Sequence, residues 1–201
     1  INVANNALCG VTYDHHTTPF LVQPPLSLNC GFIAFCDALE CSHTITTIDF
    51  STNVLYEAGC LRLVQALEKT DTLTSLNLHD CCIARKANGG PLDSEPSFAG
   101  LIELAHLMAT NETITSLELG RNMLSGEHPY DHLEGVSLLA DGIAGNGALV
   151  RLDLSHNFLR QAGAVPLAHL GEVDGLIGLQ VGDVCPCSGR KVRPTTAQLC
   201  T

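Results

Sequence analysis

The stretch "LVRLDLSHNFL", Leu149 to Leu159, sets apolar residues at its first, fourth, sixth and eleventh positions and an asparagine at its ninth. A helix would repeat its apolar residues every 3.6 positions, and a half-buried strand would alternate them along its whole length. Only the fourth and sixth positions, Leu152 and Leu154, follow the two-residue period of a strand. The spacing therefore predicts a very short strand that is followed by a turn at Asn157.

The same eleven-residue frame occurs three more times upstream. "ITTIDFSTNVL" begins at Ile45, "LTSLNLHDCCI" at Leu73 and "ITSLELGRNML" at Ile114. Cys81 occupies the ninth position of the second of these segments, and "LIGLQVGDV", from Leu176, keeps the first, fourth and sixth positions of a fifth copy. Repetition of one frame predicts a repeat protein, in which each unit buries its apolar face only against its neighbours.

These segments resemble the leucine-rich repeat signature L-x-x-L-x-L-x-x-N/C-x-L, which accepts Asn or Cys at the ninth position. Six residues after the asparagine, Gly59 and Gly163 each precede an apolar helical stripe. This second half is similar to the ribonuclease-inhibitor-like subclass, which resembles the repeat arrays of NOD-like receptors, Ran GTPase-activating proteins, tropomodulins and ciliary proteins. The resemblance implies an α/β fold, a leucine-rich-repeat solenoid (horseshoe) with a parallel concave sheet and convex helices. It also implies that the ninth-position asparagine bonds the backbone of a neighbouring repeat.

The spacing between the copies indicates the domain organisation. Two segments rich in Gly, Pro and charge separate strand from helix, so we predict loops inserted near 85–97 and 126–132. Residues 1–184 are predicted to form a leucine-rich repeat domain of about five to six repeats, and 185–201 a C-terminal cap or tail. Near the start of the chain, "GFIAFCDAL" (31–39) fits the helix slot, and Phe20 and Val22 are expected to form the strand before it. Ahead of them, "INVANNAL" (1–8) fits the strand frame of a repeat that lacks its first position.

The frame leaves its fifth, seventh and eighth positions free of the core, and we expect them on the concave face and its rim. The fifth position carries three carboxylates and no base, and parallel strands about 4.8 Å apart bring such residues into one stripe. This stripe is either a contact for a partner protein or only the solvated face of a sheet. The candidate partner-binding residues on the concave face are Asp49, Asn77, His79, Asp80, Glu118, Arg121, Asp153 and His156.

We predict no catalytic, cofactor-binding or metal-binding residues, and therefore no enzyme. "YDHH" (13–16) lacks the further aspartates of a metal-dependent phosphoesterase, and no phosphate-binding glycine motif is present. The short strands of a solenoid provide neither the strained turn nor the pocket that a nucleophile needs, although three suitable side chains share the concave face: Ser51, His79 and Asp80. The tail holds one thiol fewer than a usual structural zinc site, namely Cys185, Cys187 and Cys200.

Composition restricts the class of partner. The 10 basic and 21 acidic residues give a formal charge of −11, which repels the phosphate backbone of nucleic acids and favours basic or polar protein surfaces. Cys36 and Cys60 lie within apolar helical patterns, which favours reduced thiols and a cytoplasmic location, including the cytoskeleton or cilium. No apolar run reaches the length of about 18 residues that a membrane span needs.

These observations favour a non-catalytic protein–protein interaction scaffold, as a structural or regulatory subunit of a larger cytoskeletal or ciliary assembly. The long loops favour this interpretation because loops on a rigid scaffold commonly carry specific contacts. Two alternatives remain open: the ligand-sensing repeat array of a NOD-like immune receptor, and a GTPase-activating protein of the Ran type, whose family holds its GTPase on an acidic concave edge. Because the chain begins with Ile1, we expect it to be part of a larger chain or complex.

Overall fold

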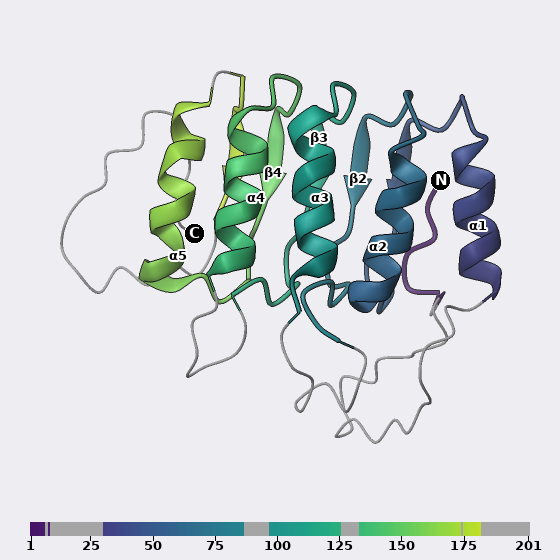
Figure 1. Ribbon diagram of the computed structural model, residues 1–201, viewed down its shortest axis with the longest axis horizontal. Coiled ribbons are helices and arrows are strands. Elements are labelled where there is room, and N and C mark those ends of the chain that lie inside the picture. The colour runs from purple at the N-terminus through teal and green to yellow at the C-terminus, as the bar shows by residue number, and fades with distance from the viewer. Residues whose placement is uncertain (7, 9–29, 87–96, 126–132, 174, 182–201) are drawn as a thin grey trace.

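The computed structural model describes residues 1–6, 8, 30–86, 97–125, 133–173 and 175–181. Strands and helices alternate along the chain (Figure 1). The strands are β1 (Thr47–Asp49), β2 (Ser75–Asn77), β3 (Ser116–Glu118), β4 (Arg151–Asp153) and β5 (Gly178–Gln180). The helices are α1 (Cys30–Glu40), α2 (Tyr56–Leu67), α3 (Ala99–Thr110), α4 (Glu134–Ala144), α5 (Arg160–Leu167) and the 3-10 helix η1 (Ala168–Glu172).

The five strands form one open, parallel sheet in the order of the sequence. Residues at the same frame position lie side by side, so the fourth positions form one row: Ile48, Leu76, Leu117, Leu152 and Leu179. Residues 1–5 add a further rung beside β1, where Asn2 and Asp49 form a parallel bridge and the Val3 N–H donates to the Asp49 carbonyl at 2.9 Å. The register confirms the prediction of an α/β fold with a parallel sheet.

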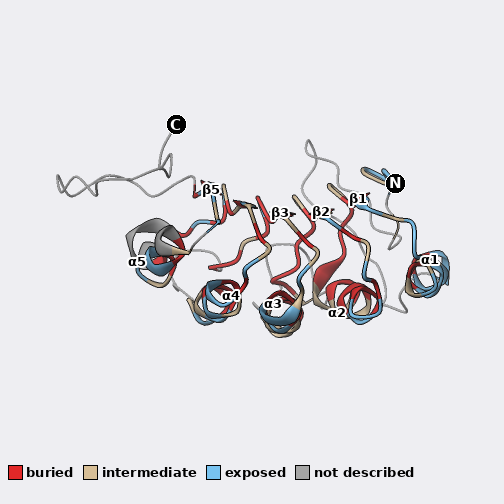
Figure 2. Ribbon diagram, turned by 90° about the horizontal axis from the view of Figure 1, so that it is seen from above, coloured by how far each residue is buried: buried red, intermediate tan, exposed pale blue. Residues whose placement is uncertain are grey.

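All helices lie on one face of the sheet, and the core lies between the two layers (Figure 2). The fourth- and sixth-position side chains of β3, Leu117 and Leu119, are fully buried there, as are Leu101 and Leu104 of α3. No helix covers the other face of the sheet among the residues that the structure describes (Figure 2). None of the described helices is both long and apolar enough to cross a lipid bilayer.

The first rung confirms the strand frame of residues 1–8 but differs from the expected order of elements. Residues 1–5 lie next to β1, so α1 belongs to the unit that begins at Ile1, although residues 9–29 separate the two in the sequence. Phe20 and Val22, which the sequence favours as the strand before α1, lie outside the described residues. The cap or tail at 185–201 and most of the two expected loops, 85–97 and 126–132, also lie outside them.

Buried asparagines tie three of the described repeats to the repeat before each of them. The Nδ2 of Asn122 donates to the Leu78 carbonyl of the preceding repeat at 2.7 Å and to the Leu119 carbonyl of its own repeat at 2.9 Å. Its Oδ1 accepts the Cys81 N–H at 3.0 Å. Bonds to the preceding repeat are made in the same way by two other buried asparagines, Asn53 and Asn157. The ninth-position asparagines therefore form the ladder that the resemblance implies.

Cys81 interrupts this ladder. Its Sγ still donates to the Phe50 carbonyl of the preceding repeat, at 3.4 Å, but a thiol lacks the amide oxygen that accepts backbone N–H groups elsewhere. The Leu55 N–H of that preceding repeat bonds instead to the main-chain carbonyl of Cys81 at 2.9 Å. In the turn that follows β1, the residue with a left-handed backbone is Tyr56, just after the frame ends. In the next three repeats it is the tenth residue of the frame: Cys82, Met123 and Phe158. The Cys for Asn exchange thus coincides with a rerouted turn.

Helices α3 and α4 pack closely because Gly142 has no side chain. A Cβ there would lie 2.4 Å from the Ala105 carbonyl oxygen. Alanine normally stabilises a helix interior by about 1 kcal/mol relative to glycine, but here the methyl group would push two helix backbones apart. We expect Gly142→Ala to lower the free energy of unfolding by about 1–3 kcal/mol in urea denaturation.

Gly145→Ala is the matched control for this effect, because a Cβ at Gly145 would meet no atom within 4 Å. We expect this variant to unfold at the same urea concentration as the wild type or slightly above it. Equal destabilisation by the two substitutions would contradict the close approach of α3 and α4.

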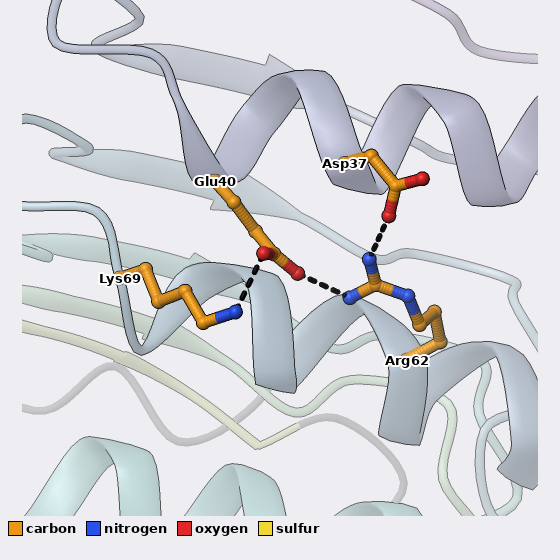
Figure 3. Close-up of polar contacts among 4 residues, drawn as sticks. All are labelled: Asp37, Glu40, Arg62 and Lys69. Atoms are coloured by element: carbon orange, nitrogen blue, oxygen red, sulfur yellow. Dashed lines mark hydrogen bonds and ion pairs between the residues drawn. The ribbon is translucent and has the colours of Figure 1, made fainter.

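An ion-pair network joins α1 to α2 on the outer surface of the helices (Figure 3). Arg62 of α2 pairs with Asp37 through Nη2 and with Glu40 through Nη1, at 2.5 Å and 2.8 Å. Lys69 also pairs with Glu40, at 2.5 Å. The hydrogen bonds from Lys69 and Arg62 lower the pKa of Glu40. The charges of this cluster are therefore paired with one another, and they link α1 to α2 and the residues that follow it.

Candidate functional site

The side of the sheet away from the helices carries only polar side chains and glycine. The third and fifth frame positions of each strand, with the seventh position that follows, form this surface, which we call the polar face. Its members are Thr47, Asp49, Ser51, Ser75, Asn77, His79, Ser116, Glu118, Gly120, Arg151, Asp153, Ser155, Gly178 and Gln180. Because these residues include no tryptophan or tyrosine, which are common at interface hot spots, recognition on this surface would depend on charge and hydrogen bonding.

The fifth positions form one row across the polar face, as the frame predicts. The register pairs them in the order Asp49, Asn77, Glu118, Asp153 and Gln180. The row contains three carboxylates and no lysine or arginine. Within the described part of the chain, no ion pair neutralises any of these three carboxylates. The geometry of the row is therefore as expected, whereas its binding of a partner stays a prediction.

The three carboxylates differ in how many of their oxygens are already used. Asp49 accepts the Ser51 N–H at 2.9 Å through Oδ1 and the Asn2 amide at 3.0 Å through Oδ2. Asp153 accepts the Ser155 N–H at 2.8 Å through Oδ1 alone. Glu118 is exposed, and none of the hydrogen bonds of the described residues involves its carboxylate. Glu118 is therefore the carboxylate of the row that is most available to another molecule.

A glycine positions the imidazole of His79. A Cβ on Gly120 would lie 2.5 Å from His79 Nδ1 and 3.1 Å from Ser155 Oγ, so only glycine lets the ring lie over the chain that follows β3. The Asn77 side chain accepts the His79 N–H at 2.9 Å and fixes the backbone beneath the ring. His79 thus leans toward β3, away from β1 and Ser51, so the structure does not bring the two together as a nucleophile and its base.

The remaining candidate residues lie on the rim, at the eighth position. They are Asp80, Arg121 and His156, and with Thr52 at the same position of the first full repeat they share a left-handed backbone with φ of +57° to +58°. This conformation costs a non-glycine residue roughly 1–2 kcal/mol. Hydrogen bonds between repeats hold it: the N–H of Asp80, for example, donates to the Gly120 carbonyl of the next repeat at 2.8 Å. Arg121 and His156 are exposed on this rim.

The buried thiols have the properties of core residues. Burial raises the pKa of Cys36 to about 11 and that of Cys60 to about 12, and it also raises the pKa of Cys81. None of these three thiols is part of a disulfide. The described residues include no group of three or more His, Cys, Asp or Glu side chains that could hold a metal ion. Protonated thiols in such positions act as small apolar side chains.

The chain matches no known protein-family model and no curated protein sequence. Solved structures do share its architecture. The fold is similar to that of leiomodin-1 actin-binding site 2. The TM-score is 0.52 at 17% sequence identity, and the match covers 71% of this chain and 69% of that chain. A likeness at this identity establishes a repeat-like α/β fold, while the ribonuclease-inhibitor-like subclass stays a prediction.

Proposed function

We propose that this chain is a non-catalytic protein-binding scaffold whose contact surface is the polar face. The observation that carries the proposal is the fifth-position row, which lies in register on a side of the sheet that no described helix covers. The asparagine ladder supports the proposal because it holds successive strands at a fixed spacing. A partner would therefore meet side chains on a rigid frame, which limits the conformational entropy lost on binding.

The absence of a catalytic role is part of this proposal. His79 is the one imidazole on the polar face, and no hydrogen bond joins it to a serine hydroxyl among the described residues. Hydrolysis by a serine nucleophile needs such a bond, together with donors for the developing oxyanion.

We further propose a structural or regulatory role in a larger cytoskeletal assembly, in the cytoplasm or the cilium. In this proposal the repeats continue the ribonuclease-inhibitor-like pattern, and the polar face forms the concave side of a horseshoe-shaped solenoid. The support is the fold shared with leiomodin-1 actin-binding site 2, a protein whose name states that it binds actin. Filamentous actin is therefore the first purified partner to test.

Site-specific photo-crosslinking tests the contact surface. A photoreactive amino acid would replace Thr47, an exposed residue on the polar face, or Leu138, an exposed residue of α4 on the helical side. We expect covalent adducts with filamentous actin, or with a protein from a cytoskeletal extract, at Thr47 and none at Leu138. Adducts at Leu138 alone, or equal yields at both positions, would place the contact elsewhere and contradict the proposal.

A further inference from the structure

We propose that the polar face binds a basic polypeptide segment in extended conformation, which crosses the strands along the fifth-position row. The inference rests on the proposed function and specifies the chemistry of the partner. It concerns the whole uncovered face of the sheet, with its charge, its spacing and its lack of apolar groups.

Charge complementarity predicts that the partner segment is positively charged. The row presents Asp49, Glu118 and Asp153 without a neighbouring cation in the row, and the whole chain carries a formal charge of −11. Arg151 is the cation of the polar face, but it lies at a third position, where its stem packs over Gly178 and its Nε lies 3.4 Å from Ser116 Oγ. Among the described residues, no ion pair joins Arg151 to the three carboxylates. The polar face therefore keeps an excess of negative charge, which favours lysine and arginine side chains on the partner.

The distance between neighbouring strands favours a partner segment in extended conformation. Parallel strands lie about 4.8 Å apart, so β1 and β4 are separated by about 14 Å across the sheet. An extended chain rises about 3.3 Å per residue, and its side chains on one side recur about every 6.7 Å. Three basic residues at alternate positions thus span about 13 Å and can reach Asp49, Glu118 and Asp153 together. In a run of adjacent basic residues, every second side chain would point away.

The hydrogen bonds that each carboxylate already accepts predict which one contributes most to binding of the basic segment. Both oxygens of Asp49 are engaged within the chain, and one oxygen of Asp153 is engaged. Glu118 lies between its neighbours Asn77 and Asp153, is exposed, and has both oxygens available. Because hydrogen bonds to a charged group are stronger than neutral ones, we expect the loss of the Glu118 charge to weaken binding about tenfold. The Asp49 charge should contribute least.

Fluorescence anisotropy with two labelled peptides tests the inference on the intact chain. One peptide has lysine at alternate positions separated by serine, and the other has the same composition with its lysines in one block. We expect the alternating peptide to bind more tightly, and Glu118→Gln to weaken its binding about tenfold. Glu134→Gln makes the same change of charge on the exposed surface of α4, and its affinity should match the wild type. The affinity of Asp49→Asn for the alternating peptide should lie between those of Glu118→Gln and Glu134→Gln.

Three results would overturn the inference: unchanged affinity in Glu118→Gln, an equal loss in Glu134→Gln, or equal binding of the two peptides. Glu118 is exposed, so a thermal melt that matches the wild type will show that its variant is folded. If excess alternating peptide does not reduce the yield of crosslinking at Thr47, the scaffold proposal stays intact and this inference alone is rejected. Failure of both the crosslink and the peptide titration would reject both.

Discussion

Leu119→Asp is expected to abolish the cooperative folding of the central repeats. Leu119 is fully buried at the sixth frame position of its repeat. Its N–H donates to the Asp153 carbonyl at 2.8 Å, and its carbonyl accepts the side-chain amides of Asn122 and Asn157. An unpaired buried charge costs several kcal/mol, which is a large share of the about 5–15 kcal/mol that stabilises a typical domain. The loss should spread, because each repeat is stable only against its neighbours.

Circular dichroism during heating would measure this effect. We expect the Leu119→Asp chain to show a broad transition or none, where the wild type shows a single cooperative one. Arg121→Asp is the matched control, since it introduces the same carboxylate two residues away at an exposed rim position. Aspartate also tolerates the left-handed backbone of that position better than most residues. A cooperative melt that Leu119→Asp leaves unchanged would be incompatible with the buried frame.

The repeat frame was predictable because its information is local. Each unit buries its apolar side chains against the units beside it, so the spacing within eleven residues already specifies which side chains face the core. The row from Ile48 to Leu179 follows directly from the frame. The same register places Asp49, Glu118 and Asp153 in one row, which is why the candidate surface could also be predicted from the sequence.

The combination of the first rung with α1 in one unit could not be predicted in the same way. Its segment lacks the first frame position, and residues 9–29 separate it from α1, so no spacing within the sequence connects the two. Phe20 and Val22 alternate as strand residues do, and they are nearer to α1 in the sequence. Pairing with β1 is a long-range contact, and the apolar pattern alone does not encode it.

The details of the candidate surface also depended on three-dimensional geometry. The left-handed backbone on the rim falls on Thr52 and Arg121, which are not the glycines that usually signal it. Asn2 donates a hydrogen bond to Asp49 from a different repeat. Gly120 likewise leaves room for the ring of His79, which belongs to the preceding repeat. The sequence predicted which residues share the surface, but not which of them have free hydrogen-bonding groups.

Asn122→Ala is expected to be the most destabilising loss of a single polar side chain. The amide of Asn122 is fully buried and joins two repeats, since it donates to the carbonyls of Leu78 and Leu119 and accepts the Cys81 N–H. Removing it leaves buried backbone groups without partners, each at a cost of about 1–3 kcal/mol. We expect the free energy of unfolding to fall by about 3–5 kcal/mol in urea denaturation.

Cys81→Ala is the control at the same frame position of the neighbouring repeat. The Cys81 thiol makes only long contacts, at 3.4 Å and 3.5 Å, with the carbonyls of Phe50 and His79. The Leu55 N–H of the preceding repeat bonds to the main-chain carbonyl of Cys81, and the Asn53 N–H bonds to the Phe50 carbonyl. Both N–H groups therefore keep an acceptor when the thiol is removed. Its loss should cost about 1–2 kcal/mol, mainly from lost packing.

Hydrogen exchange distinguishes this explanation from a simple loss of volume. In Asn122→Ala, the amides of Cys81 and Ile83 should lose protection first, because both donate to the Oδ1 of Asn122. In Cys81→Ala, the amide of Leu55 should keep its protection, because its acceptor is the main-chain carbonyl of Cys81. If the two variants lost equal stability, or if protection fell evenly across the repeats, the ninth-position amide would not be the link between neighbouring units.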